Sequence, residues 1–137
     1  NYNPNYIIDL ATLTGACAAA LGPIYAGLFS EHEDIAKMIE ESAKHSGDKV
    51  WRLPTHEDYK VAIRSEIADI CNIGSPKYMS GATTAAYFLQ NFVGDIPWAH
   101  LDIAGVAFDT PDVSYYRSGA TGFGVRLLVD LIMNWKK

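Results

Sequence analysis

The hydrophobic and polar positions along the chain follow two periods, one typical of strands and one typical of helices. Short apolar, β-branched runs predict buried strands at residues 5–11, 25–30, 49–54 and 98–108. Helical spacing of apolar residues, or an Ala-rich run, predicts helices at residues 15–21, 31–46, 55–63, 85–93 and 122–135. Residues 72–82 and 109–122 are predicted loops. Because strands and helices alternate, the sequence predicts an α/β fold.

The ends of the predicted helices carry local signals. Gly22 and Gly47 follow the first two helices, where glycine is a common C-cap. Ser30 and Glu33 have the spacing of a capping box, which predicts how the second helix begins. In the last helix, the residues predicted to face the core are Leu127, Leu128, Leu131, Ile132 and Trp135.

Length and composition describe one domain or part of one. The chain has 137 residues, of which 49% are hydrophobic and 20% are charged, as in globular proteins. A net charge of −5 and the lack of a Lys/Arg cluster argue against nucleic-acid binding. Because no apolar run reaches about 18 residues, we expect no membrane span. The chain begins at Asn1 without a Met, so we expect a piece of a longer protein.

Two cysteines and one aromatic loop offer weak candidate sites. Cys17 and Cys71 lie in apolar contexts and are predicted to be reduced core thiols, as in a cytoplasmic protein. Cys71 is a poor candidate nucleophile because the sequence shows no His partner for it. Tyr115, Tyr116 and Arg117 could grip an anion, but packing within a loop or at a subunit contact explains them at least as well.

His100 and Asp102 form a stronger candidate pair. They lie two residues apart on a predicted strand and therefore share a face, which suits either a metal or a hydrogen-bonded polar pair. We favour the polar pair, because no third or fourth ligand stands at metal-site spacing.

The segment Thr12–Gly15 stands where a predicted strand turns into a predicted helix. Ligands of α/β sheets bind at the carboxyl ends of strands, and N–H groups at a helix start attract anions. Gly15 would also let a ligand approach closely. The simpler interpretation is that Thr12 or Thr14 only caps the helix. The pattern alone favours neither interpretation.

Six motifs follow one another along nearly the whole chain: DLATLTGA (9–16), GDKVWRLP (47–54), ADICNIG (68–74), SGATTAAYFL (80–89), WAHLDIAGVA (98–107) and GATGFGVRLLVDL (119–131). Together they closely resemble the C-terminal catalytic domain of the leucyl aminopeptidases, also called cytosol aminopeptidases. The resemblance implies that residues 1–137 are the C-terminal portion of a mixed-sheet, two-metal catalytic domain with flanking helices.

The resemblance also implies an activity for the longer protein. In this family two manganese or zinc ions activate the water that removes N-terminal residues, with a Leu-type preference, from peptides. A Lys polarises the intermediate, an Arg holds bicarbonate, and the family assembles as cytoplasmic hexamers. The family's metal segments, including the motif NTDAEGR, precede DLATLTGA. We therefore expect no catalytic or metal-binding residue within this chain, and no activity without the missing N-terminal part.

The resemblance implies that this chain forms part of the wall of the substrate-binding site. By position, Thr12, Leu13 and Gly15 resemble the family's loop beside the first substrate residue. Ala104 and Ala107 resemble the floor of its apolar pocket, although some relatives carry Met where this chain has Ala107. The alternative is a non-catalytic relative with a structural or DNA-associated role, for which the acidic charge offers no support.

Overall fold

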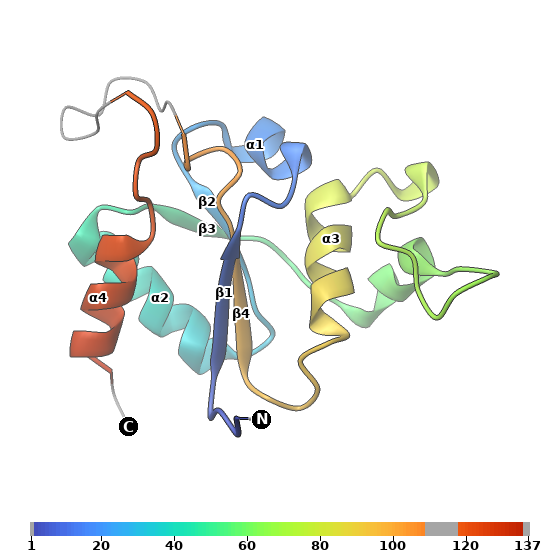
Figure 1. The fold of residues 1–137 in the computed structure, drawn as a ribbon, viewed down its shortest axis with the longest axis horizontal. Helices are drawn as coiled ribbons and strands as arrows, with labels where there is room; N and C mark the ends of the chain where they lie inside the picture. The colour runs from blue at the N-terminus through green and yellow to red at the C-terminus, as the bar shows by residue number, and fades with distance from the viewer. Residues whose placement is uncertain (1, 109–117, 136–137) are drawn as a thin grey trace.

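The strands of the chain form one mixed sheet between two layers of helices (Figure 1). The computed structural model describes residues 2–108 and 118–135. The elements in these residues are, in order, β1 (Ile7–Ala11), α1 (Gly15–Leu21), β2 (Ala26–Phe29), α2 (Glu33–Ser46), β3 (Val50–Arg52), the 3₁₀ helices η1 (Glu57–Ile63) and η2 (Pro76–Tyr78), α3 (Gly81–Gln90), β4 (Trp98–Asp102) and α4 (Val125–Met133).

The sheet has the strand order β1-β4-β2-β3. β1 and β4 are parallel, in a register that pairs Ile7 with Trp98 and Ala11 with Asp102. β2 runs antiparallel to β4 and parallel to β3. The predicted α/β class with a mixed sheet is therefore confirmed.

Each face of the sheet is covered by a pair of helices. α2 and α4 pack on one face, and α1 and α3 lie on the other (Figure 1). The core under α2 and α4 includes Leu28, Ile35, Ile39, Leu101, Leu127 and Leu131. The core under α1 and α3 includes Cys17, Phe29, Ala86 and Trp98. Cys17 is thus a core residue, as predicted, whereas Cys71 is only half-buried.

The predicted helix ends at glycines are confirmed. The Gly22 N–H donates to the Ala18 carbonyl oxygen at 2.8 Å after α1, with a φ of 63°. Gly47 has a left-handed conformation and donates to the Ala43 carbonyl oxygen after α2. Both positions need the positive φ that glycine adopts without strain.

The predicted capping box of α2 is wrong. The N-cap of α2 is His32, and its side chain makes no capping hydrogen bond. The Ser30 hydroxyl instead donates to the Trp98 carbonyl oxygen at 2.6 Å and accepts from the His32 N–H. Glu33 forms ion pairs with Lys37 and Arg52. The side chains of Ser30 and Glu33 therefore bind these other partners and do not cap the start of α2.

Three other predicted boundaries shift. The strand predicted at 98–108 ends at Asp102, because the Ile103 carbonyl accepts from the N–H groups of Val106 and Ala107 in a turn. The loop predicted at 72–82 contains η2 and the first residues of α3, which spans Gly81–Gln90 rather than 85–93. In α4, Ile132 was predicted to be buried but is 71% exposed.

Within the described part of the chain, no helix is both long and apolar enough to cross a membrane.

Candidate functional site

The segment between β1 and α1 begins a capped helix. Thr14 has extended backbone angles, and its hydroxyl accepts a hydrogen bond from the Cys17 N–H at 3.0 Å. This contact satisfies one of the N–H groups that a helix start leaves without a partner. The capping interpretation of Thr14 is therefore confirmed, and Thr12 is not the cap.

The N–H groups at the start of α1 could attract an anion, and in the structure a carboxylate of the same chain takes this place. Asp102 stands at the end of β4, and its Oδ1 accepts from the Leu13 N–H at 3.1 Å and the Thr14 N–H at 3.4 Å. Its Oδ2 accepts from the Thr14 hydroxyl at 2.7 Å. The N–H groups before α1 therefore already have a negatively charged partner.

The same carboxylate holds the second predicted segment. The Ala104 N–H donates to Asp102 Oδ1 at 3.1 Å, so this oxygen binds both Leu13 and Ala104. Ala107 follows in the same turn, and its carbonyl oxygen accepts from the Thr121 N–H. The structure thus brings together two predicted substrate-wall segments that lie far apart in the sequence.

Gly105 fixes the position of this turn against α1. A Cβ atom on Gly105 would lie 2.4 Å from the Gly22 carbonyl oxygen and 3.3 Å from the Ala18 Cα. The close approach therefore requires glycine.

The five predicted substrate-binding residues are all reachable from solvent. Thr12 and Gly15 are exposed, and Leu13, Ala104 and Ala107 are partly exposed. Gly15 has open space where a side chain would stand.

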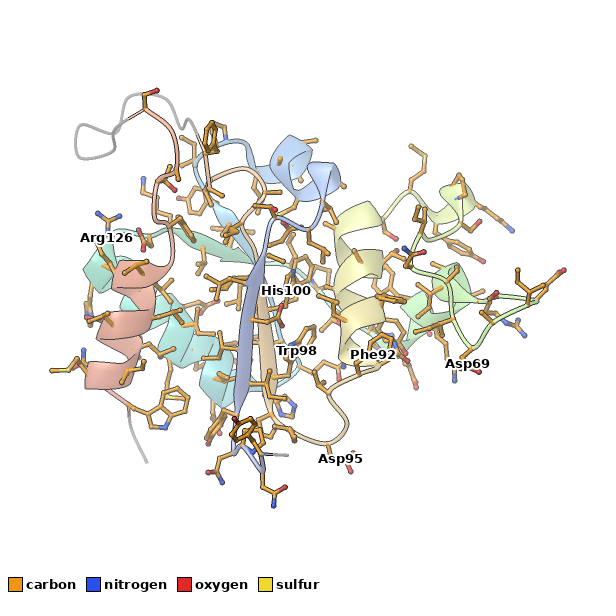
Figure 2. All side chains as sticks on the ribbon, viewed as in Figure 1. Asp69, Phe92, Asp95, Trp98, His100 and Arg126 are labelled. Carbon is orange, nitrogen blue, oxygen red and sulfur yellow. The ribbon has the colours of Figure 1, made fainter. Side chains whose placement is uncertain are left out.

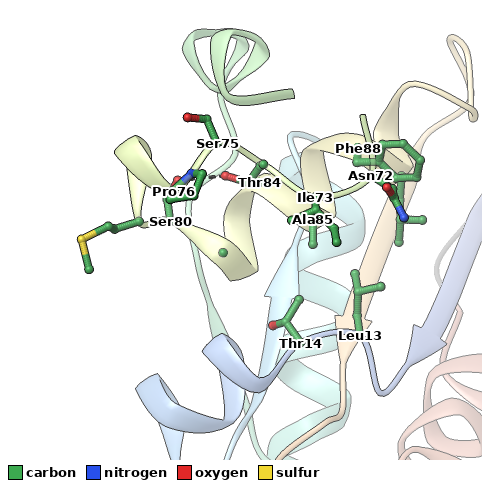
Figure 3. Close-up of a pocket in the computed structure, with 14 residues that line it drawn as sticks. Leu13, Thr14, Asn72, Ile73, Ser75, Pro76, Ser80, Thr84, Ala85 and Phe88 are labelled. Carbon is green, nitrogen blue, oxygen red and sulfur yellow. Dashed lines mark hydrogen bonds between the residues drawn. The ribbon is translucent and has the colours of Figure 1, made fainter. Parts of the chain in front are cut away.

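A cavity of about 540 Å³ opens beside Leu13 and Thr14 (Figure 3). Its other wall comes from α3 and from the loop that precedes it, with Ile73, Ala85 and Phe88 as apolar side chains. The cavity does not include Thr12, Gly15, Ala104 or Ala107 in its lining. The remaining lining residues are Asn72, Gly74, Ser75, Pro76, Met79, Ser80, Gly81, Thr84 and Leu89.

Sequence reasoning missed the α3 wall of this cavity. Ala85 and Phe88 were predicted only as residues of an amphipathic helix, and Ile73 only as part of a loop. Gly74 packs so closely on α3 that a Cβ there would lie 2.4 Å from Thr84 Cγ2. A signal in the sequence was Gly74 in the predicted loop 72–82, since glycine permits such a close approach.

Cys17 lies under the Asp102 end of β4. Burial, and secondarily the Asp102 charge, raise the pKa of the Cys17 thiol to about 11. Its Sγ donates to the Asp102 carbonyl oxygen at 3.7 Å. Cys17 is therefore a neutral thiol near pH 7 with a packing role.

His100 and Asp102 do not bind each other. His100 Nδ1 lies 2.6 Å from Asp9 Oδ1, and the Trp98 indole N–H donates to Asp9 Oδ2 at 2.6 Å. The His100 ring is fully buried and stacks between Phe29 and Trp98, on the face of the sheet toward α3 (Figure 2). Each residue makes polar contacts with other segments, which agrees with a hydrogen-bonding role for both.

The described residues do not match a metal centre. In residues 2–108 and 118–135, no three His, Cys, Asp or Glu side chains converge as metal ligands would.

The Cys71 thiol, a weak candidate nucleophile, donates to the Ile73 carbonyl oxygen at 3.2 Å. Tyr115, Tyr116 and Arg117 lie outside the described residues.

Comparisons with known proteins agree with one another. The profile described as "Cytosol aminopeptidase family, catalytic domain" matches residues 1–129. A "Probable cytosol aminopeptidase" of Chloroherpeton thalassium is 53% identical over 137 residues, covering 98% of this chain and 26% of that relative. The protein of the same name from Chlorobaculum parvum is 53% identical over 135 residues, with the same coverage.

A solved structure of a mutant of tomato leucine aminopeptidase is 42% identical, with a TM-score of 0.84 over 94% of this chain and 24% of that chain. The chain therefore spans about a quarter of the length of these relatives.

Proposed function

The chain belongs to the cytosol aminopeptidase family, and from this premise we propose that it is part of an enzyme that removes N-terminal residues from peptides by two-metal hydrolysis. The relatives that it matches are named probable cytosol aminopeptidases, which supports the removal of N-terminal residues. In the proposal, the described residues bind and orient the substrate, with a preference for Leu-type side chains. Other segments of the whole protein hold the metal ions.

The observation that carries this proposal is the position of Leu13. Its side chain lines the cavity of about 540 Å³, and its N–H is held by Asp102. The facing wall includes Ile73, Ala85 and Phe88. Burial of a Leu-sized side chain is worth about 1.5–3 kcal/mol, so an apolar cavity of this kind supports an apolar preference.

The turn after β4, which does not line this cavity, is proposed as a further wall of the substrate site. Ala104 and Ala107 have small, partly exposed side chains, and Asp102 holds Ala104 close to Leu13. Thr12 and Gly15 extend the first wall toward solvent. Small residues in such a wall leave volume for a substrate side chain.

The metals of the whole enzyme are proposed to be manganese or zinc, with bicarbonate as an auxiliary group. When bound, paired metal ions supply an activated water and stabilise the oxyanion that forms from the peptide carbonyl. In the proposal, other segments of the whole protein hold the metal ions, and the described residues bind the substrate and fix its orientation. Cytoplasmic location, supported by the cytosolic name of the relatives, and a hexameric assembly complete the proposal.

The test uses the whole protein. After chelation, it should hydrolyse Leu-p-nitroanilide only when manganese or zinc is restored, and Leu-p-nitroanilide faster than the Gly compound. A peptide with a free N-terminus should be shortened, while its N-acetylated copy should stay intact, because an aminopeptidase recognises the free amine. Equal cleavage of the acetylated copy, or no hydrolysis with either metal, would refute the proposal.

A further inference from the structure

We infer that Asp102 is a positioning residue, whose buried carboxylate sets the distance between the Thr12–Gly15 segment and the Ile103–Ala107 turn. This inference rests on the proposed function, because only there are both segments walls of one substrate site. It adds a role for a side chain that touches neither the cavity nor solvent.

The side-chain contacts of Asp102 link two segments of the chain. Asp102 Oδ1 accepts from the Leu13, Thr14 and Ala104 N–H groups at 3.1, 3.4 and 3.1 Å. Oδ2 accepts from the Thr14 hydroxyl at 2.7 Å. Leu13 is 89 residues from Asp102 in the sequence, whereas Ala104 is its near neighbour. One side chain therefore joins the end of β1 to the turn after β4.

The environment makes this link rigid. Asp102 is 1% exposed, so its contacts compete little with water. Hydrogen bonds to an ionised acceptor are about twice as strong as neutral ones. The main chain is tied as well, since Asp102 pairs with Ala11 across the sheet and its carbonyl oxygen accepts from the Cys17 thiol. Neither wall can shift without breaking a contact to Asp102.

Asn is the informative replacement because it keeps the size of Asp102. Its oxygen can still accept from N–H groups, but its NH₂ group stands where Oδ2 accepts the Thr14 hydroxyl proton. The walls should then move relative to each other. Since a misplacement of about 1 Å can cost about 100-fold in rate, we expect kcat/KM on Leu-p-nitroanilide to fall about 10- to 100-fold in Asp102→Asn.

Asp48→Asn is the matched control. Asp48 is also fully buried and accepts from the N–H groups of Gly124 at 3.0 Å and Leu127 at 3.3 Å, and its Oδ1 accepts from the Arg126 guanidinium in an ion pair. These contacts hold the start of α4, on the other side of the sheet from α1 and α3. In the whole protein, both Asp-to-Asn variants should melt at lower temperature, but Asp48→Asn should keep the wild-type kcat/KM.

Thr14 offers a second pair of variants at the same contact, and the pair also tests the cap of α1, because the Thr14 hydroxyl accepts from the Cys17 N–H. Thr14→Val removes the hydroxyl that donates to Asp102, and Thr14→Ser keeps it. Val should lower kcat/KM in the same direction as Asp102→Asn, and Ser should restore most of it. Amide hydrogen exchange should rise in both wall segments, 12–15 and 103–107, for Asp102→Asn and in neither for Asp48→Asn.

The outcomes separate the two claims. A wild-type protein without aminopeptidase activity would overturn the proposed function, and the exchange data would still decide whether Asp102 couples the two segments. An active wild type with unchanged kcat/KM in Asp102→Asn and Thr14→Val would overturn the positioning role alone. Exchange that rises in only one of the two segments would also overturn it.

Discussion

Gly105 has no room for a side chain, so Gly105→Ala tests how the turn after β4 packs on α1. The added Cβ would lie 2.4 Å from the Gly22 carbonyl oxygen and 3.3 Å from the Ala18 Cα. Non-bonded contacts are comfortable at about 3.5 Å, so the turn must move away from α1 by about 1 Å. Both obstructing atoms belong to the backbone and cannot rotate aside. We expect a loss of about 1–3 kcal/mol in the free energy of unfolding, as for other overpacked sites.

Differential scanning fluorimetry of the whole protein measures this loss, with Gly15→Ala as the matched variant. An added Cβ at Gly15 meets no atom within 4 Å, and Gly15 is the first residue of α1. Ala is favoured over Gly in helices by about 0.5–1 kcal/mol, so Gly15→Ala should melt at or above the wild-type temperature. If Gly105→Ala melts at the wild-type temperature and keeps wild-type kcat/KM, the described packing of the turn is wrong.

Three further predictions concern specificity, pH and the isolated chain. In the whole protein, Ala104→Phe should lower activity on Leu-p-nitroanilide about 5- to 150-fold more than on the Gly compound, because overfilling a pocket costs about 1–3 kcal/mol; equal losses would remove Ala104 from the pocket. The pKa of Cys17 rises from 9.0 to about 11 on folding, so the unfolded chain loses this proton first and the free energy of unfolding should fall as the pH rises through that window. Urea titrations should show this alkaline fall in the wild type and not in Cys17→Ala. Residues 1–137 alone should hydrolyse no Leu-p-nitroanilide above the blank with added manganese or zinc, and metal-dependent turnover by the purified piece would contradict the assignment of catalysis to other segments.

Local signals predicted those parts of the fold that neighbouring residues determine. Gly22 and Gly47 end their helices at the predicted positions because a left-handed turn is a property of a few adjacent residues. Ser30 shows the limit of such signals, since its hydroxyl bonds to the Trp98 carbonyl oxygen, 68 residues away. No spacing within the helix can reveal that competing partner.

The same distinction applies to the candidate site. Thr14 was one of two candidate caps, and its contact to the Cys17 N–H spans only three residues. Asp102 was predicted to be a polar residue near a strand end, but its partners Leu13 and Thr14 lie 89 and 88 residues away. The strand was predicted to continue past Asp102 to residue 108 because the residues there are apolar. A turn that packs on a helix also needs apolar residues, so the two cannot be told apart from the sequence.

The register of β1 on β4 determines when the sheet can form as the ribosome makes the chain. β2 and β3 pair Ala26 with Val50, so they can meet soon after both have emerged. Ala11 must wait for Asp102, which is 91 residues later in the chain. At about 5–20 residues per second, that wait lasts roughly 5–20 s, during which Ile8 and Leu10 lack the β4 residues of the core that they pack against in the folded structure. Among the four strands of the described sheet, the first to be synthesised therefore waits longest for its partner, and an unpaired strand is a site for aggregation during this interval.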